Sequence, residues 1–339
     1  MKMKAVGMYK ALPITDESSL VDVQMTKPVP TKHDLLVKIA AVSVNPVDTK
    51  LRVAQNKMGI SPRILGFDAV GTIVGKGSEV TLFHDGEEVY FAGDVTRQGN
   101  NAEYTLIDER LVGHKPVNLT NAEAAAMPLT TITATEALFD RLQIVSGKSI
   151  LIINGAGGVG SVATQLAKLA GLTVISTASR ADTVSWTKAH GADYVINHHE
   201  DMLIQLQKLG FRSVDYILCL HDTYRHFSFM EQAIKPQGKI CTIVDLTHPV
   251  DMRVLKDKSA TLSFEFMFTR SKYQTEDQMK QHDILEQATL YFETGQLKST
   301  LNKVLTPFNA ETLRLAHQTI EEGQMIGKLV VEGFDNDGK

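Results

Sequence analysis

Three glycines at fixed spacing follow a short apolar run near the middle of the chain. The run SILIIN at 149–154 leads into Gly155, Gly157 and Gly160, and then into a segment with apolar residues at helical spacing. A strand that turns directly into a helix exposes the first N–H groups of the helix and the positive end of its dipole, which favour an anion. Glycines permit the tight turn, the approach of a phosphate and close helix–strand packing. The predicted dinucleotide site consists of Gly155, Gly157, Gly158, Val159 and Gly160, and the alternative is a glycine-rich turn without a ligand.

The residues after the next predicted strand indicate which dinucleotide binds. An acid about 20 residues after the glycines would bind the ribose hydroxyls of NAD, but position 180 is Arg, within TASRADT. Ser179 and Arg180 can donate hydrogen bonds to a 2′-phosphate, and Arg180 can do so through two bonds. The alternative is that Arg180 is a solvated residue in the first turn of a helix. We therefore predict NADPH as the cofactor.

The composition of the chain limits the classes of protein, partner and location that are expected for it. The chain has 339 residues, 43% hydrophobic and 22% charged, which suggests two domains of an ordinary globular protein. The net charge of −4 without a basic block argues against nucleic acid as a partner. The chain shows no signal-peptide core and no run long enough to cross a membrane. With only two cysteines, Cys219 and Cys241, expected as buried free thiols, we expect a cytoplasmic protein.

The secondary structure that the sequence predicts around the glycine motif differs between the two halves of the chain. Residues 1–115 show closely spaced strand patterns with glycine turns, which predict a small barrel or sandwich. From 149 onward, strand and helix patterns alternate as far as 244, with one of the helices expected over 226–235. This alternation predicts an α/β unit with a doubly wound parallel sheet. Two helices, about 276–294 and 309–322, precede a last strand at 326–331. Because they fall outside the alternation, we expect them to return to the first domain.

Several motifs together resemble the medium-chain dehydrogenase/reductase superfamily, and its zinc-free quinone-oxidoreductase branch in particular. The motifs are SVNPVDTKLR (43–52), ILGFDAVGTIVGKGSEV (64–80), MPLTTITATEAL (127–138), GAGGVGS (155–161), GADYVIN (191–197) and the terminal IGKLV. Proteins of this kind are often labelled zinc-type alcohol dehydrogenase-like. The resemblance implies a GroES-like catalytic domain over 1–125, a Rossmann NADP(H) domain over 126–271, and a segment 272–339 that returns to the catalytic domain.

The residues at the family's zinc-ligand positions do not suit zinc. In zinc-dependent relatives the ligands are a Cys, the His of a Gly-His-Glu motif and a second Cys, and the resemblance places Asn45, Phe67 and Leu129 there. An amide, a phenyl ring and an isobutyl group cannot hold zinc, and two cysteines cannot form a four-thiolate structural site. We therefore predict no metal site.

The resemblance also implies roles for further residues in hydride transfer to a conjugated carbonyl. Asn45 would donate its amide N–H to the acceptor oxygen, and Asp48 would order Asn45 or its loop, the alternative being a turn cap beside Pro46. Thr133 and Lys328 resemble residues close to the cofactor, although a backbone-bonded hydroxyl and a solvated lysine are the alternatives. His198 stands where the branch often has Tyr and would contact the adenine or the phosphate. Cys219 stands where the family commonly has Asp, so the local cofactor loop is expected to differ.

The sequence thus leaves two classes of function open. The first is an NADPH-dependent reductase of quinones or other α,β-unsaturated carbonyls, with a small-molecule substrate and no nucleic acid or membrane partner. The second is a non-catalytic NADPH-binding protein on the same fold, and a zinc alcohol dehydrogenase is disfavoured by the missing ligands. The family implies a homodimer, for which the apolar segment 262–268 is a candidate edge strand.

Overall fold

The computed structural model describes residues 1–54 and 60–334, and the described chain divides into two compact units. The first unit comprises Met1–Leu129 and Phe268–Lys339, and the second comprises Thr130–Met267. The sequence predicted the boundaries at 125/126 and 271/272. Helix α3 (Pro128–Thr135) contains the first boundary.

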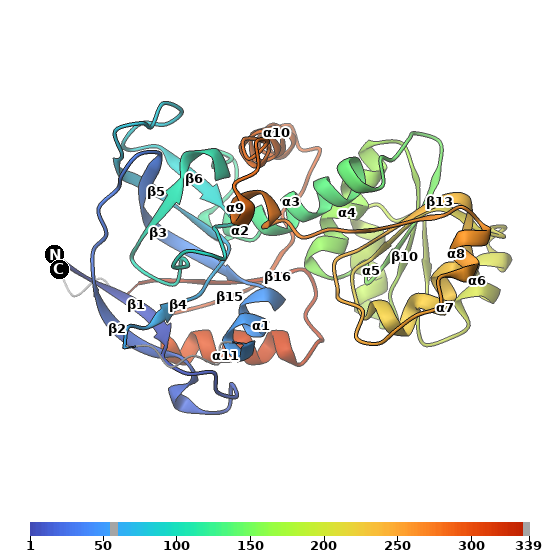
Figure 1. Ribbon diagram of the computed structural model, residues 1–339, viewed down its shortest axis with the longest axis horizontal. Coiled ribbons are helices and arrows are strands. Elements are labelled where there is room, and N and C mark those ends of the chain that lie inside the picture. Colours follow the sequence, from blue (N-terminus) through green and yellow to red (C-terminus); the bar gives the residue numbers. More distant parts are fainter. Residues whose placement is uncertain (55–59, 335–339) are drawn as a thin grey trace. The chain divides into compact units, whose positions relative to one another are not determined.

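The first unit is built on two sheets and is drawn in blue, cyan and red in Figure 1. Among the described residues, the larger sheet has the order β15-β16-β3-β5-β6-β8, with β7 also paired to β3, and the smaller has the order β2-β1-β4. The strands of the larger sheet are β3 (Asp34–Val44), β5 (Ala69–Lys76), β6 (Glu88–Phe91), β7 (Tyr104–Asp108), β8 (Val112–His114), β15 (Leu301–Leu305) and β16 (Lys328–Glu332). Those of the smaller sheet are β1 (Lys2–Met8), β2 (Val21–Thr26) and β4 (Arg63–Ile64).

The C-terminal strand returns to the first unit, as the sequence predicts. β16 pairs antiparallel with β3, with Leu329 opposite Val44. The helices of this unit are α1 (Pro46–Ala54), α2 (Asn121–Ala125), α9 (Thr269–Tyr273), α10 (Lys280–Glu293) and α11 (Ala310–Glu321), with short turns η1 (Glu17–Ser19) and η2 (Glu109–Leu111). Helix α10 packs against β8, and the hydroxyl of Tyr90 donates a 2.7 Å hydrogen bond to the carbonyl of Leu285 in α10.

The second unit is a parallel sheet with the strand order β11-β10-β9-β12-β13-β14, which is the doubly wound order of a Rossmann fold. Its strands are β9 (Ser149–Ile153), β10 (Thr173–Thr177), β11 (Tyr194–Ile196), β12 (Val214–Cys219), β13 (Ile234–Thr242) and β14 (Thr261–Phe264). Its helices are α4 (Gly158–Leu169), α5 (Ala181–Ala189), α6 (Met202–Lys208), α7 (Thr223–Ala233), α8 (Arg253–Asp257) and the π-helical segment η3 (Glu136–Arg141). The predicted α/β fold is confirmed.

Helices cover both faces of this sheet because successive strand residues point to opposite sides. Ile175 in β10 belongs to an apolar cluster with Met202 of α6 and Phe227 of α7. Its neighbour Ser176 faces the other way, with its hydroxyl oxygen 3.5 Å from that of Thr164 in α4. Because each strand is covered on both faces, the strands read as apolar runs rather than as alternating patterns.

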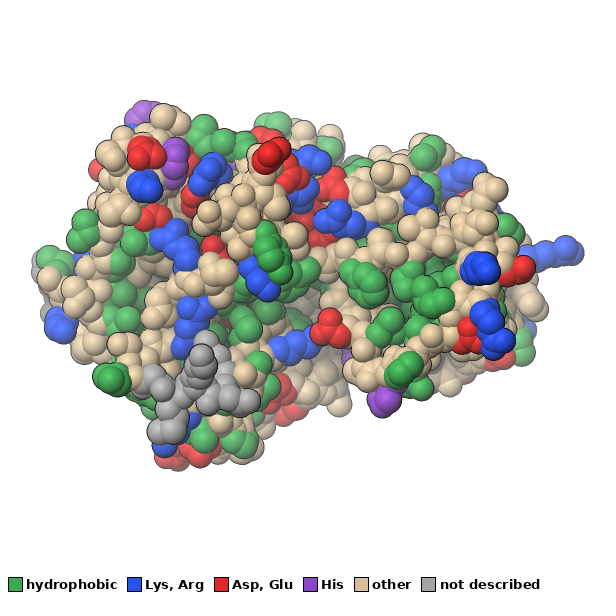
Figure 2. Space-filling model, viewed as in Figure 1, with side chains coloured by type: hydrophobic (Ala, Val, Ile, Leu, Met, Phe, Trp, Pro, Cys, Tyr) green, Lys and Arg blue, Asp and Glu red, His purple; other side chains and the backbone are tan. Residues whose placement is uncertain are grey.

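The two cysteines are buried free thiols on neighbouring strands, as the sequence predicts. Cys241 of β13 lies opposite Leu218 in β12. Burial raises the pKa of Cys219 to about 11 and that of Cys241 to about 12, so both thiols are unreactive near neutral pH. In Figure 2, acidic and basic side chains are interspersed over the face in view. Within the described part of the chain, no helix combines the length and the apolar character needed to cross a membrane.

A buried arginine joins α1 to α11 in the first unit. Arg52 is 1% exposed, and its guanidinium donates to the carbonyl of Leu12 and to the Glu321 carboxylate. Nearby His317 is fully buried, and neither ring nitrogen has a hydrogen-bond partner among the described residues. Burial, followed by the charge of Arg52, lowers the pKa of His317 to about 3. The folded protein therefore holds this histidine in its neutral form.

This neutral histidine should make the fold less stable in acid. Between pH 6.5 and 3 the unfolded state binds a proton at His317 that the folded state does not, so stability falls as the pH falls through 6.5. From pH 8 to pH 5 we expect a loss of about 2 kcal/mol from this group, measured by urea unfolding of the parent and of His317→Leu. His84→Leu, at an exposed histidine, is the control. Identical pH dependence in the parent and in His317→Leu would contradict the prediction.

Candidate active site

The glycine turn lies directly between β9 and α4. Asn154 begins it in a left-handed conformation, with a φ of 70°. A Cβ atom added at Gly155 would lie 2.3 Å from the hydroxyl oxygen of Ser176, and one at Gly160 would lie 2.3 Å from the carbonyl oxygen of Asn154. A larger residue at Gly155 would clash with the Ser176 side chain of β10, and one at Gly160 would clash with the backbone of the turn itself. The absence of a Cβ atom at Gly155 and Gly160 therefore allows the turn to pack closely against β10 and against itself.

Helix α4 begins without a side-chain cap. Gly157 is its N-cap residue, with extended φ and ψ of −73° and 172°. The first N–H groups of a helix have no acceptor within the helix, so Gly158, Val159 and Gly160 present donors at the positive end of the helix dipole. This arrangement fits a phosphate group. The residues present therefore suit the pyrophosphate of a dinucleotide.

Ser179 and Arg180 follow β10 at the same edge of the sheet. The Arg180 side chain is about half exposed, and its Nε lies 3.3 Å from Oδ1 of Asp182. That oxygen also accepts the backbone N–H of Thr183 at 2.7 Å, which keeps Asp182 in the first turn of α5. An exposed ion pair of this kind contributes little to stability. A phosphate can therefore compete with Asp182 for Arg180.

His198 follows β11 and lies near two arginines and two other histidines. Its ring centroid is 4.4 Å from that of His199, and its Nδ1 atom is buried with no hydrogen-bond partner among the described residues. Burial is the largest factor that lowers the pKa of His198. The charges that lower this pKa further are, in decreasing order, those of His199, Arg225, His221 and Arg180. A buried nitrogen without a partner among the described residues, near the guanidinium groups of Arg225 and Arg180, favours an anionic ligand.

The segment CLHD, which departs from the family pattern, forms an ordered start to α7. The Cys219 thiol donates to the carbonyl of His221 at 3.3 Å. Asp222 has a left-handed φ of 38°, and its side chain accepts the N–H of Arg225 at 3.1 Å. The helix therefore begins at Thr223, so the prediction of a helix over 226–235 was wrong at its start. Sequence reasoning also missed Arg225 and His221, whose proximity to His198 depends on how β11 and β12 are arranged in the sheet.

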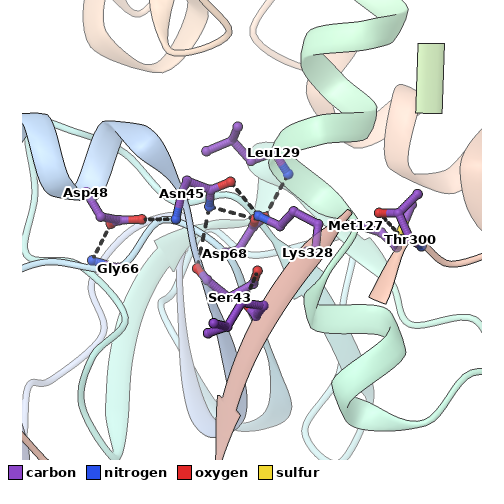
Figure 3. Close-up of polar contacts among 10 residues, drawn as sticks. Ser43, Asn45, Asp48, Gly66, Asp68, Met127, Leu129, Thr300 and Lys328 are labelled. Atoms are coloured by element: carbon purple, nitrogen blue, oxygen red, sulfur yellow. Dashed lines mark hydrogen bonds and ion pairs between the residues drawn. The ribbon is translucent and has the colours of Figure 1, made fainter. Parts of the chain in front are cut away.

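In the first unit, Asp48 holds the backbone where β3 gives way to α1. One carboxylate oxygen of Asp48 accepts the N–H of Asn45 at 2.7 Å, and the other accepts the N–H of Gly66 at 3.0 Å (Figure 3). Asp48 is 1% exposed. Burial raises its pKa to about 7, although both N–H donors and the Lys328 charge oppose that rise. Asp48 is therefore placed to order the turn that carries Asn45.

Asn45, Asp68 and Lys328 form a closed, buried triangle of polar groups (Figure 3). The Lys328 ammonium donates to Oδ1 of Asn45 and, at 2.9 Å, to Oδ2 of Asp68. The Asn45 amide donates to the same Asp68 oxygen at 2.8 Å. Burial raises the pKa of Asp68, and Lys328, followed by Asn45, counters the rise. Lys328 is 4% exposed, so the alternative of a solvated strand-edge lysine is wrong.

Asp68 is the residue of this triangle that sequence reasoning missed. It lies 23 positions after Asn45 and 260 before Lys328, and its signal was its place in GFD, directly after the non-ligating Phe67. Its second carboxylate oxygen accepts the N–H of Leu129 at 2.7 Å. Asp68 is fully buried in the structure, so its carboxylate must find partners.

The three positions that would hold zinc in zinc-dependent relatives are occupied by groups with other contacts. The Asn45 amide is bonded to Asp68 and Lys328. The Phe67 ring packs edge-on against Phe268 with a centroid distance of 5.4 Å. Leu129 contributes its backbone N–H to Asp68. Within residues 1–54 and 60–334, no group of three or more His, Cys, Asp or Glu side chains is arranged to hold a metal ion.

The predicted site residues fall into two sets, one in each unit. Asn45, Asp48 and Lys328 lie together in the first unit. The glycine turn and the cationic residues that follow β10 and β11 lie in the second unit, at the carboxyl end of its sheet. Thr133, in α3, is buried and also belongs to the second unit. The roles predicted for these residues toward cofactor and substrate stay predictions.

The chain combines a glycine turn on a Rossmann sheet with a β unit that has a buried polar centre. This combination is typical of two-domain nicotinamide-dependent oxidoreductases. The model of the alcohol dehydrogenase GroES-like domain matches residues 31–132, and that of the zinc-binding dehydrogenase matches residues 190–331.

Individual relatives agree with this class. The chain is 45% identical to a zinc-type alcohol dehydrogenase-like protein of Staphylococcus aureus, over 97% of this chain and 99% of that protein. It is 30% identical to the chloroplastic NADPH-dependent alkenal/one oxidoreductase of Arabidopsis thaliana, over 88% of this chain and 72% of that protein. A Rhizobium etli structure, described as a zinc-dependent alcohol dehydrogenase, has a TM-score of 0.95 at 43% identity and covers 98% of this chain and 99% of its own. The protein belongs to the medium-chain dehydrogenase/reductase superfamily of oxidoreductases, whose members bind a nicotinamide cofactor.

Proposed function

We propose that this protein is an NADPH-dependent reductase of quinones or other α,β-unsaturated carbonyl compounds that works without a metal. The observation that carries the proposal is the buried triangle of Asn45, Asp68 and Lys328. Asn45 stands at one of the positions of the zinc ligands in zinc-dependent relatives, and Asp68 accepts the backbone N–H of Leu129, which stands at another. A lysine ammonium at this place would repel a second cation. The triangle therefore supports carbonyl chemistry that depends on protein groups alone.

The preference for NADPH is supported by the charges around the end of β10. Arg180 stands where NAD-binding proteins of this fold commonly have an acid. His198, whose Nδ1 has no hydrogen-bond partner in the described part of the chain, and the nearby Arg225 add further positive or protonatable groups. A 2′-phosphate would supply the negative charge that these groups lack. The NADPH named in the description of the Arabidopsis relative agrees with this cofactor.

The chemistry requires little beyond positioning and electrostatics. Bound NADPH supplies a hydride, with its two electrons, and leaves as NADP⁺. The acceptor takes the hydride at its β-carbon, its carbon–carbon double bond shifts, and negative charge collects on the carbonyl oxygen as an enolate. A solvent proton at the α-carbon then gives the saturated carbonyl. This chain must therefore hold the acceptor, keep bulk water away and stabilise the oxyanion.

A turnover assay tests the proposal directly. The purified full-length protein would be mixed with 1,2-naphthoquinone or with a simple enone such as 3-buten-2-one, and the oxidation of NADPH and NADH would be followed separately. We expect turnover with NADPH and little with NADH. NADPH binding without turnover of either acceptor would instead favour the non-catalytic NADPH-binding protein. A homodimer in a cytoplasmic location stays a further expectation.

Metal content gives a separate prediction. Because no three His, Cys, Asp or Glu side chains among the described residues are grouped to hold a metal ion, we expect the purified protein to contain no stoichiometric zinc and to keep its activity in the presence of EDTA. Elemental analysis of the protein, purified without an affinity tag that binds metal, checks the first point. One tightly held zinc per chain, lost together with activity on chelation, would overturn the metal-independent mechanism.

A further inference from the structure

A full positive charge lies among the positions at which related enzymes hold zinc. It belongs to Lys328, whose side chain is 5% exposed and whose Nζ lies 2.9 Å from Oδ2 of Asp68. The pairing of β16 with β3 brings the lysine to Asn45, which follows directly after β3 (Figure 3). A charge in a low-dielectric interior acts more strongly on its neighbours than one in water. This ammonium is therefore the strongest source of positive potential in the buried polar centre of the first unit.

The hydrogen bonds of the triangle distinguish Lys328 from Asn45 as a donor toward a substrate. One Asn45 N–H donates to Asp68 at 2.8 Å, and the other points toward the carbonyl of Ser43 at a long 3.4 Å. The Lys328 ammonium has three N–H bonds, and two of them donate to Asn45 and Asp68. Among the described residues, no acceptor is recorded for the third, which can therefore donate to a ligand atom. Of the two residues, only the lysine can offer both a net charge and a donor.

The rest of the triangle fixes the ammonium. Asp68 accepts hydrogen bonds from Leu129, Asn45 and Lys328, so its carboxylate has little freedom to move. The Asn45 amide has a fixed orientation, because the reverse orientation would turn its NH₂ group toward the ammonium. Asp48 in turn holds the Asn45 backbone. The charge is thus pre-positioned, which is the condition for efficient electrostatic stabilisation of a transition state.

We propose that Lys328 is a catalytic residue whose ammonium donates a hydrogen bond to the carbonyl oxygen of the acceptor, while Asp68 and Asn45 are positioning residues. This inference rests on the proposed function. As the hydride reaches the β-carbon and the carbonyl oxygen becomes an enolate oxygen, the ammonium stabilises the new negative charge. Lys328 keeps its proton throughout, and the α-carbon takes its proton from solvent. A fixed ammonium thereby takes the role that a zinc ion fills as a Lewis acid.

The test removes the charge without leaving a buried charge unpaired. In the double variant Lys328→Met/Asp68→Asn, named the neutral pair, both members of the ion pair become neutral. The two new side chains have approximately the volume of the original ones. We expect kcat with NADPH and 3-buten-2-one to fall by about 10²–10³-fold, the range for one oxyanion donor. The Kd for NADPH, measured by nicotinamide fluorescence, should stay within about threefold, well under one tenfold step of 1.4 kcal/mol. Lys303→Met, at an exposed lysine of the neighbouring strand β15, is the matched control and should keep the parent kcat.

Two more variants separate catalysis from positioning. Asn45→Ala should lower kcat by less than the neutral pair does, because the ammonium and Asp68 remain, and it should leave the Kd for NADPH unchanged. Lys328→Arg keeps a charged donor and should retain more kcat than the neutral pair. If the neutral pair does not fold, the double variant Lys328→Gln/Asp68→Asn replaces it in the same comparison. This second variant keeps polar atoms in the buried site.

Several results would overturn the inference. An unchanged kcat in a folded neutral pair would remove Lys328 from the chemistry while leaving the proposed reductase function intact. A large rise in the Kd for NADPH with an unchanged kcat would make Lys328 a cofactor contact instead. A greater loss of kcat in Asn45→Ala than in the neutral pair would return the donor role to the amide. A parent protein with no turnover on any acceptor would overturn the proposed function, and with it this inference.

Discussion

Replacing Lys328 alone with Met is expected to lower the free energy of unfolding by about 3–5 kcal/mol, the usual cost of removing one partner of a buried ion pair. The loss arises because the Asp68 carboxylate is fully buried and would keep only neutral donors. Adding Asp68→Asn to the same protein should restore most of that stability, since a neutral amide is far less costly to bury. The single variant should therefore be less stable than the double variant.

Chemical unfolding followed by circular dichroism measures this difference. The parent, both Lys328 variants and the exposed-site control Lys303→Met would be compared in one buffer at pH 8. We expect the control to lie within about 0.5 kcal/mol of the parent, as is usual for surface substitutions. If the single and double variants were equally unstable, the ion pair would not be the reason for the loss. Packing of the lysine stem would then be the better explanation.

Replacing Arg180 with Ala is expected to raise the Kd for NADPH by about 10- to 150-fold and to leave the Kd for NADH almost unchanged. One charge-assisted hydrogen bond contributes roughly 1.5–3 kcal/mol, and each 1.4 kcal/mol corresponds to about tenfold in affinity. The Arg180 side chain is 45% exposed and is shared with Asp182, which favours the low end of this range. His198 and Arg225, close by, would compensate in part.

Titration of both cofactors by nicotinamide fluorescence decides the role of Arg180. Arg212→Ala is the matched control, because Arg212 is an exposed arginine that precedes β12 and so lies at the opposite, amino end of that strand. The control should bind both cofactors as the parent does. Equal weakening of NADPH and NADH in Arg180→Ala, or a parent without preference for NADPH, would remove the 2′-phosphate contact assigned to Arg180.

The features that the sequence determined by itself are local or periodic. The turn at Gly155 and Gly160 follows from neighbouring residues, because an apolar run, glycines and a helical pattern are contiguous. The alternation from 149 to 244 predicts the parallel sheet because a helix between two strands returns the chain, so that the second strand runs parallel to the first. The lack of zinc ligands at Asn45 and Phe67 follows from residue identity alone. None of these inferences requires knowing which distant segments meet.

Some local features escaped the sequence because competing patterns were equally plausible. Helix α1 starts beside Pro46 and Asp48, which also fit a simple turn, and only its packing against α11 distinguishes the two. Helix α7 begins three residues before the predicted position because Asp222 caps it from a left-handed conformation. Such a conformation is unusual for a residue other than glycine, so propensity does not anticipate it.

The tertiary structure alone decided the chemistry of the polar centre. Lys328 and Asn45 are 283 residues apart, and they meet because the last strand pairs with β3 in one register. From the sequence alone, a lysine in the last strand is expected to be solvated, and an aspartate after a phenylalanine is expected to lie at the end of a strand. Both become a buried ion pair only when the sheet closes over them, because a charge without water must have a partner of opposite sign. The sequence supplies the two charges, and the long-range strand pairing brings them together.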